Sequence, residues 1–139
     1  MIKIYSRSDK EKLLHILFKK KDFNKRQDLI NPSEFIQVAS LVLKKAQTFI
    51  PHKHIFKKAS LDRDIIAQES WVVIRGKVKV DYYDTDDSFL DAFILDEGDC
   101  TVTLYGGHNY TSLTSDTLVY EFKTGPYDGQ IKDKISIKC

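Results

Sequence analysis

The sequence predicts an all-β protein built as a sandwich or barrel of antiparallel strands. Two observations lead to this fold class. From Phe35 onward, short runs rich in β-branched and aromatic residues follow one another at nearly regular spacing, and clusters of Gly, Asp and Ser separate them. The 139 residues are 42% hydrophobic and 30% charged, which is the balance of one globular domain. We therefore expect a single compact core.

The N-terminal residues are compatible with two structures. Ser8 and Glu11 have capping-box spacing just before an apolar run, which suits a short amphipathic helix. In the same run Leu14, Ile16 and Phe18 occupy alternate positions, which suits a strand. Helix and strand both stay open for this segment.

Residues 35–139 are expected to form the barrel, and residues 1–34 an extension of it. The run 78–82 alternates apolar with charged residues, as a strand with one buried face does. Asp84–Ser88 is typical of a turn, because Asp and Ser side chains bond to their own backbone. Further apolar runs predict strands near residues 35–43, 71–74, 90–95, 102–104 and 118–122. The expected core residues are Val72, Ile74, Val78, Val80, Phe93, Leu95, Leu104, Val119 and Phe122.

Composition argues against several classes of partner. The 22 basic and 20 acidic residues leave a net charge of only +2, which is not the basic footprint of a nucleic-acid-binding protein. Two cysteines are too few for a disulfide scaffold, which favours a reducing, cytoplasmic location. No run approaches 18 apolar residues and the N-terminus has no signal-peptide core, so we expect no membrane association.

The concentrated chemical signal is a set of metal-ligating side chains. His52 and His54 lie two residues apart at the end of an expected strand, so both imidazoles point to one face of the sheet. Glu69 begins the next long strand and offers a carboxylate. His108 follows a double glycine that permits a sharp turn. Histidine and carboxylate ligands of this kind suit Zn, Fe, Mn, Ni or Cu. We interpret the remaining histidine, His15, as structural.

These residues resemble the motifs of the cupin superfamily. The first cupin motif has the form HxH, a spacer, then Glu, six residues and Gly, and His52, His54, Glu69 and Gly76 match it. The second motif has a Gly-containing turn and a third His, to which His108 is similar. The stretches PHKH, QESWVVIRGKVKVDYYD, EGDC, GGHNY and YEFKTGPYDG more closely resemble a family of small single-domain cupins often met in bacterial surface-polysaccharide gene clusters.

The resemblance extends over about residues 35–132 and carries expectations about fold and partners. It implies an antiparallel jelly-roll barrel in which His52, His54, Glu69 and His108 hold a divalent metal ion. It also implies that the N-terminal extension packs on the barrel or on a partner subunit, and hence a homodimer.

Two departures from the cupin pattern leave alternatives open. Fourteen residues separate His54 from Glu69, where the usual spacer has three or four, so an acid within this insertion is an alternative to Glu69 as the ligand. The proline usual in the second motif is absent. If the turn is displaced by two residues, Tyr110 takes the place of His108.

The expected ligand is a small molecule such as an anionic sugar derivative. The insertion Ile55–Gln68 is longer than most strand connections and is expected to form a lid over the pocket. Within it, Lys57 and Arg63 would attract an anion, while Trp71 and Tyr110 would line the pocket.

The leading functional hypothesis is a metal-dependent isomerase or epimerase that acts on a sugar or sugar nucleotide in cytoplasmic carbohydrate metabolism. An Fe(II)-dependent dioxygenase and a non-enzymatic small-ligand-binding cupin are the alternatives.

Overall fold

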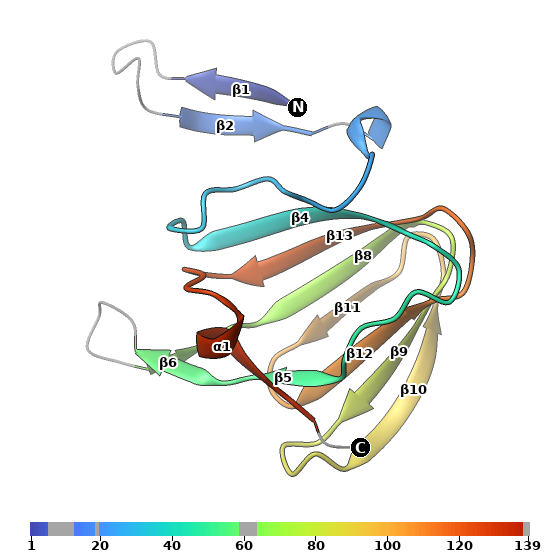
Figure 1. Ribbon diagram of the computed structural model, residues 1–139. Coiled ribbons are helices and arrows are strands. Elements are labelled where there is room, and N and C mark those ends of the chain that lie inside the picture. The colour runs from blue at the N-terminus through green and yellow to red at the C-terminus, as the bar shows by residue number, and fades with distance from the viewer. Residues whose placement is uncertain (6–12, 19, 59–63, 138–139) are drawn as a thin grey trace.

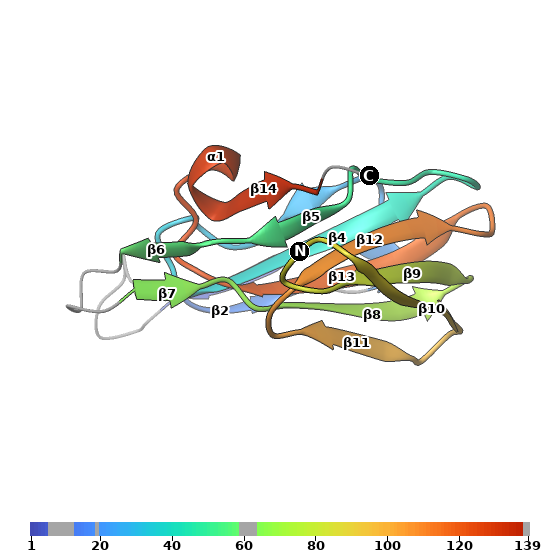
Figure 2. The same ribbon diagram turned by 90° about the horizontal axis from the view of Figure 1, so that it is seen from below.

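The chain folds into two five-stranded antiparallel sheets that face each other, as shown by a computed structural model that describes residues 1–5, 13–18, 20–58 and 64–137 (Figures 1 and 2). The first sheet has the order β10 (Phe89–Leu95), β9 (Val78–Tyr83), β12 (Gly107–Ser112), β5 (His52–His54) and β14 (Lys134–Ser136). The second has the order β11 (Cys100–Thr103), β8 (Glu69–Arg75), β13 (Thr117–Thr124), β4 (Ile36–Leu43) and β3 (Gln27–Asp28).

Most connections cross from one sheet to the other, although β9 and β10 form a hairpin within the first sheet and β3 and β4 pair within the second. This is the jelly-roll arrangement that the resemblance implied. The chain passes from β8 to β9, in the facing sheet, through a turn at Gly76. Gly76 has a φ of +89°, and a Cβ there would lie 2.5 Å from the Thr114 Oγ1 atom. This turn therefore requires glycine on both conformational and steric grounds.

The core lies between the facing sheets. Leu41, Val73 and Val119 fill it from one sheet, and Val78 and Val80 fill it from the other. Four of the expected core residues are buried as predicted, namely Val78, Val80, Leu95 and Val119.

The expected core was wrong at the remaining positions. Strand β8 turns Glu69, Trp71 and Val73 inward, so Val72 and Ile74 lie on its outer, half-buried face. A one-residue change of register exchanges the two faces of a strand, and the continuous apolar run 71–74 does not define which face is buried. The structure exposes the other three predicted core residues, Phe93, Leu104 and Phe122.

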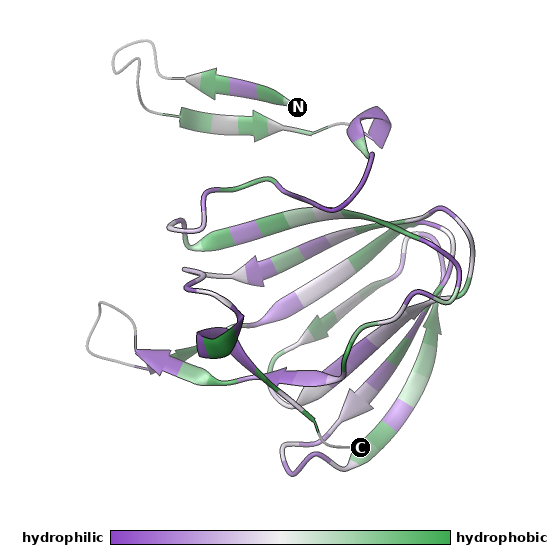
Figure 3. Cartoon of the chain, in the orientation of Figure 1, coloured by the Kyte–Doolittle hydropathy of each residue, from purple (hydrophilic) through white to green (hydrophobic). Residues whose placement is uncertain are grey.

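The described residues at the start of the N-terminal extension form a hairpin rather than a helix, and β3, further along the extension, joins the second sheet. Strands β1 (Ile2–Tyr5) and β2 (Leu13–Leu17) pair antiparallel, and a 3-10 turn, η1 (Lys20–Asp22), follows. The capping-box residues Ser8 and Glu11 lie outside the described residues. The hairpin stands apart from the two main sheets and carries apolar residues on both strands (Figures 1 and 3).

The insertion after β5 also forms a hairpin. Strands β6 (Phe56–Lys58) and β7 (Asp64–Ile66) pair with each other at one end of the barrel (Figure 2). At the other end of the sequence, a short helix, α1 (Gln130–Asp133), leads directly into β14. Neither α1 nor η1, the helical turns in the described residues, is long and apolar enough to cross a lipid bilayer.

Two leucines test the observed arrangement of the core. Leu41 is 1% exposed, whereas Leu104 is 53% exposed. Leu41→Ala should lower the free energy of unfolding by about 2–5 kcal/mol, because it removes buried methyl groups and leaves a cavity. Leu104→Ala should change it by less than about 0.5 kcal/mol. Urea denaturation of both variants checks this, and equal losses would contradict the arrangement.

Candidate metal centre

Three histidines and one glutamate converge between the sheets. His52 and His54 come from β5, His108 from the neighbouring strand β12, and Glu69 from β8 in the facing sheet. One ligand atom from each of the four residues lies within 4.8 Å of the others. All four side chains are buried, and His108 is completely so. We call these four residues the His3Glu cluster.

Strand geometry brings the three imidazoles together. Alternation along β5 turns His52 and His54 inward and leaves Lys53 between them half-buried. In the β5–β12 ladder His52 pairs directly with His108. A Cβ at Gly107 would lie 2.1 Å from the Ile137 Cδ1 atom and 3.3 Å from the His52 carbonyl oxygen. The glycine before His108 therefore allows this close approach.

Hydrogen bonds at Nδ1 fix how the β5 histidines face the cluster. The His52 Nδ1 atom lies 3.0 Å from the Ile50 carbonyl oxygen, and the His54 Nδ1 atom lies 3.0 Å from Oδ2 of Asp133. Both oxygens only accept hydrogen bonds, so each Nδ1 carries a proton. The Nε2 atoms consequently face the centre of the cluster.

Burial and neighbouring charges shift the pKa values of His52 and His54 in opposite directions. Burial, together with His108 and Lys134, lowers the pKa of His52 to about 4, so this ring is neutral near pH 7. Burial also disfavours charge on His54, but the carboxylates of Asp133 and Glu69 outweigh it and raise its pKa.

Glu69 is the anionic centre of the cluster. Its Oε2 atom lies 3.1 Å from His54 Nε2, and its Oε1 atom lies 3.3 Å from His108 Nε2. The Trp71 indole donates a further hydrogen bond of 3.1 Å to Oε1. Burial alone would raise the pKa of Glu69, but the adjacent His108 and His54 rings hold it well below its usual range. The carboxylate is therefore ionised and available to a cation.

The donor set fits a divalent transition metal. Three imidazoles and a carboxylate are the ligands that such ions accept. His108 is fully buried, yet its ring nitrogens make no hydrogen bond with any described residue, and Nε2 faces Glu69. Buried polar atoms normally have partners, and a metal ion would supply one for His108 Nε2.

A cavity of about 420 Å³ opens onto the cluster at His52 and Glu69. Three aromatic residues are among those that line it: Trp71 stacks on Tyr110 at 4.0 Å between ring centroids and meets Phe49 edge-on at 5.6 Å. The N-terminal segment closes one side, where Arg26 pairs with Asp28 and Glu121 at 3.2 and 2.9 Å. A site of this size and composition accommodates a small polar molecule.

The residues predicted to contact a ligand do not all lie at the cavity. Trp71 and Tyr110 line the cavity. Lys57 does not; its ammonium donates to Asp133 and to the Pro126 carbonyl oxygen, at 2.7 Å each. Arg63 lies outside the described residues.

The structure places most of the residues between which the sequence left a choice, although Asp62 of the insertion lies outside the described residues. Glu69, rather than the exposed Asp64 of the insertion, faces the histidines. His108 stands in the cluster, while Tyr110 lies two residues further along β12 and burial raises its pKa well above the usual value. The described parts of the insertion, residues 55–58 and 64–68, do not line the cavity, so they do not form the expected lid.

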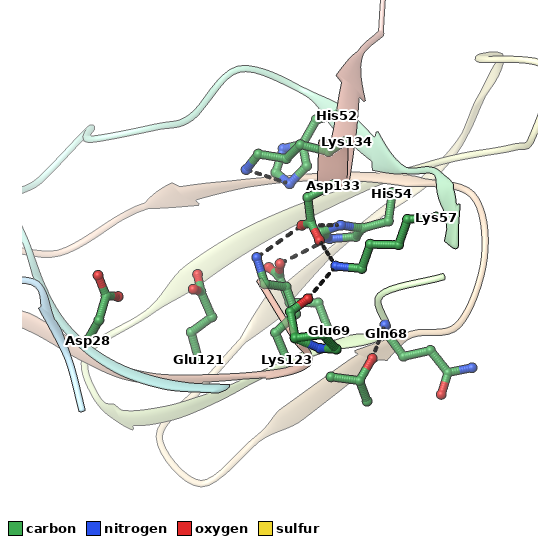
Figure 4. A network of polar contacts seen from close by, with 12 residues as sticks. Asp28, His52, His54, Lys57, Gln68, Glu69, Glu121, Lys123, Asp133 and Lys134 are labelled. Atoms are coloured by element: carbon green, nitrogen blue, oxygen red, sulfur yellow. Dashed lines mark hydrogen bonds and ion pairs between the residues drawn. The ribbon is translucent and has the colours of Figure 1, made fainter. Parts of the chain in front are cut away.

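Sequence reasoning missed three charged residues near the site. Asp133 accepts the His54 hydrogen bond, Lys123 lines the cavity and pairs with Asp133, and Lys134 contacts His52 (Figure 4). These residues follow His54 by 69 to 80 positions. Lys123 lies within the stretch YEFKTGPYDG but at no position of the two cupin metal motifs, and Asp133 and Lys134 lie outside every stretch that carries the resemblance. The signal present was the alternation of polar and apolar residues at positions 134–137, which is typical of a short strand.

Comparison with known proteins supports the fold through structure alone. No protein-family model matches the chain, and no curated protein sequence gives a significant match. Among solved structures, KdgF from Halomonas sp. is similar over 74% of this chain and 81% of its own, with 18% identity and a TM-score of 0.56. The cupin domain of Cnp3 from Schizosaccharomyces pombe is similar over 88% of this chain and 84% of its own, with 11% identity and a TM-score of 0.61.

CapF, solved with the inhibitor 3-isopropenyl-tropolone, is similar over 81% of this chain at 16% identity and a TM-score of 0.64. This chain spans only 31% of CapF. The double-sheet jelly roll and these similarities define the class of protein: the chain has the cupin fold. Within that fold, the buried His3Glu cluster has the ligands to hold a metal ion.

The neutral state of His52 predicts a pH dependence of stability in metal-free protein. The folded pKa of about 4 lies below the ordinary 6.5, so the unfolded chain binds the proton first as the pH falls. Stability should therefore decline between pH 6.5 and 4, by on the order of 2–3 kcal/mol from this group. His52→Gln should flatten the decline. Urea unfolding in the presence of a chelator measures it, and equal slopes for both proteins would contradict the prediction.

Proposed function

We propose that this protein is a metal-dependent cupin that binds a sugar or sugar nucleotide and isomerises or epimerises it in cytoplasmic carbohydrate metabolism. One observation carries the proposal. The buried His3Glu cluster, which has the ligands for a divalent cation, opens through His52 and Glu69 onto a cavity large enough for a small polar ligand.

The metal would be held by His52, His54, Glu69 and His108, and when bound it supplies a Lewis acid that polarises a carbonyl or hydroxyl oxygen. Trp71 and Tyr110 give the cavity an aromatic lining on which a sugar ring can pack. Isomerisation and epimerisation at a carbon beside a carbonyl need only the removal and return of a proton. They need no external oxidant.

Lys134 supports an anionic ligand. Its ammonium lines the cavity and lies 3.2 Å from His52 Nε2, and no carboxylate among the described residues forms an ion pair with it. The other two cavity cations, Arg26 and Lys123, are already paired with acids. Lys134 is therefore the cation best placed to bind a carboxylate or phosphate of a sugar derivative, or to stabilise negative charge on its oxygen.

Metal content tests the proposal directly. Protein purified without an affinity tag should contain about one divalent metal ion per chain, measured by elemental analysis. Glu69→Gln should weaken Zn²⁺ affinity by at least about 10-fold, because it removes the anionic ligand and retains the shape. Glu97→Gln is the matched control, since Glu97 is exposed, and should have no effect. Failure of the wild-type protein to bind Zn²⁺, Mn²⁺ or Fe²⁺ would refute the metal site.

Turnover then separates the classes of function. The metal-loaded protein should exchange a carbon-bound proton of a keto sugar nucleotide with deuterated solvent, and mass spectrometry detects the exchange. Consumption of dioxygen by the Fe²⁺ form, without exchange, would instead identify an oxygenase. Binding of tropolone without either reaction would identify a ligand-binding protein. Tropolone is a suitable probe because its adjacent oxygens chelate metals and a tropolone inhibits CapF.

We also propose that the protein is a homodimer in which the N-terminal hairpin packs on a second copy. Ile2, Ile4, Leu13 and Leu14 of this hairpin are each between 39% and 51% exposed. Phe18 and Phe23 attach its base to Tyr120 on the outside of β13, with ring centroids 6.2 and 4.9 Å from the Tyr120 ring. A two-stranded hairpin is only marginally stable in water, so a second subunit would both cover and stabilise it.

Light scattering after size exclusion checks the oligomeric state. The wild-type protein should have twice the mass of the 16.1 kDa chain. Ile2→Ser combined with Ile4→Ser should yield a monomer, because the apolar contact is lost. Ile131→Ser, at an isoleucine 92% exposed in α1, should leave the mass unchanged. A monomeric wild-type protein would overturn the proposal.

A further inference from the structure

Asp133 is a buried charge at the junction of α1 and β14. Its side chain is 0% exposed, and three donors surround its carboxylate (Figure 4). Oδ2 accepts from His54 Nδ1 at 3.0 Å and from Lys123 Nζ at 3.1 Å, while Oδ1 accepts from Lys57 Nζ at 2.7 Å. A buried carboxylate is costly unless it is paired in this way.

The contact with His54 determines which ring nitrogen faces the cluster. An ionised carboxylate only accepts hydrogen bonds, so Nδ1 of His54 must carry the proton. Nε2 is then the nitrogen directed at Glu69, 3.1 Å away. His52 has only a neutral carbonyl at the corresponding position. A carboxylate raises the basicity of an imidazole more than a carbonyl does. The Nε2 atom of His54 would therefore be a stronger metal ligand than that of His52.

Three separate segments hold Asp133 in place. Lys57 belongs to the β6–β7 insertion and also donates to the Pro126 carbonyl oxygen, at 2.7 Å. Lys123 comes from β13, where it pairs in register with Glu69. The main chain is fixed as well, because the Ile55 amide donates to the Asp133 carbonyl oxygen at 3.0 Å. The side chains of the two lysines are only 9% and 12% exposed, so their charges are directed at this carboxylate.

We propose that Asp133 is the positioning residue of the centre: it fixes His54 with Nδ1 protonated and Nε2 directed at the metal, and Lys57 and Lys123 clamp Asp133 for this task. The described part of the insertion therefore supports the His3Glu cluster through Lys57, on the side of His54 that faces Asp133, rather than by covering the cavity. This inference rests on the proposed metal site for its effect on affinity, but its effect on the His54 ring does not require a metal.

Two measurements on the full chain test the inference. In chelator-treated protein, ¹⁵N NMR of the histidine rings should show His54 Nδ1 protonated in the wild type. In Asp133→Ala the neutral ring should carry its proton on Nε2, because Glu69 is then the remaining acceptor. In the second measurement, Asp133→Ala and the isosteric Asp133→Asn should each bind Zn²⁺ about 10- to 100-fold more weakly in competition with a chromophoric chelator.

Matched variants separate positioning from general damage to the fold. Asp128→Ala removes an exposed aspartate from the same segment and should change neither measurement. Lys57→Met and Lys123→Met should each weaken Zn²⁺ binding by less than Asp133→Ala, since one lysine still holds the carboxylate. If Asp133→Ala does not fold, Asp133→Asn provides the result, because it preserves the side-chain volume.

The outcomes distinguish this inference from the proposed function. Folded Asp133 variants with Zn²⁺ affinity within twofold of the wild type would overturn it. A wild-type protein whose His54 Nδ1 lacks a proton would also overturn it. If the wild type binds no Zn²⁺, the proposed metal site fails, and the change of His54 tautomer in metal-free Asp133→Ala still decides whether Asp133 positions the ring.

Discussion

The burial of the Glu69 carboxylate is the constraint on which the rest of the site depends. Its side chain is 5% exposed between two apolar sheets, where an unpaired charge would cost several kcal/mol. His54, His108 and Trp71 surround it with nitrogen atoms within 3.3 Å. Because the two imidazoles belong to the opposite sheet, this carboxylate links the two halves of the barrel at the point where the cavity opens.

The same requirement extends outward as a chain of alternating charges. Glu69 meets His54, His54 meets Asp133, and Asp133 meets Lys57 and Lys123, each within 3.1 Å. Every buried charge in this chain has a partner of opposite sign or a ring that shares its proton. The N-terminal half of the polypeptide supplies three of the four cluster residues, while residues close to the C-terminus hydrogen-bond to His54 and to one another. Removing Asp133 would leave Lys57 and Lys123 without the carboxylate that they share.

The features that the sequence predicted depend on residues close together in the chain, whereas the features that it did not predict depend on contacts between distant residues. Local alternation was sufficient to place His52 and His54 on one face, because two residues per repeat is a property of any strand. It failed for Val72 and Ile74, where apolar residues occupy both faces and only packing against the second sheet decides the register. Asp133 was not predictable at all. Its partner His54 lies 79 residues earlier, and the pairing depends on how β14 lies against β5.

Lys134 shows how the cluster and the cavity depend on each other. The Ile50 carbonyl fixes the proton of His52 on Nδ1, so Nε2 offers a single lone pair, and the Lys134 ammonium lies 3.2 Å from it. One lone pair cannot serve an ammonium and a metal ion together. A metal ion held by His52 would therefore displace the ammonium of Lys134, a residue that also lines the cavity. Metal binding at His52 would thus be coupled to the charge that the cavity presents to a ligand, because an ammonium that left His52 would become available to an anionic group.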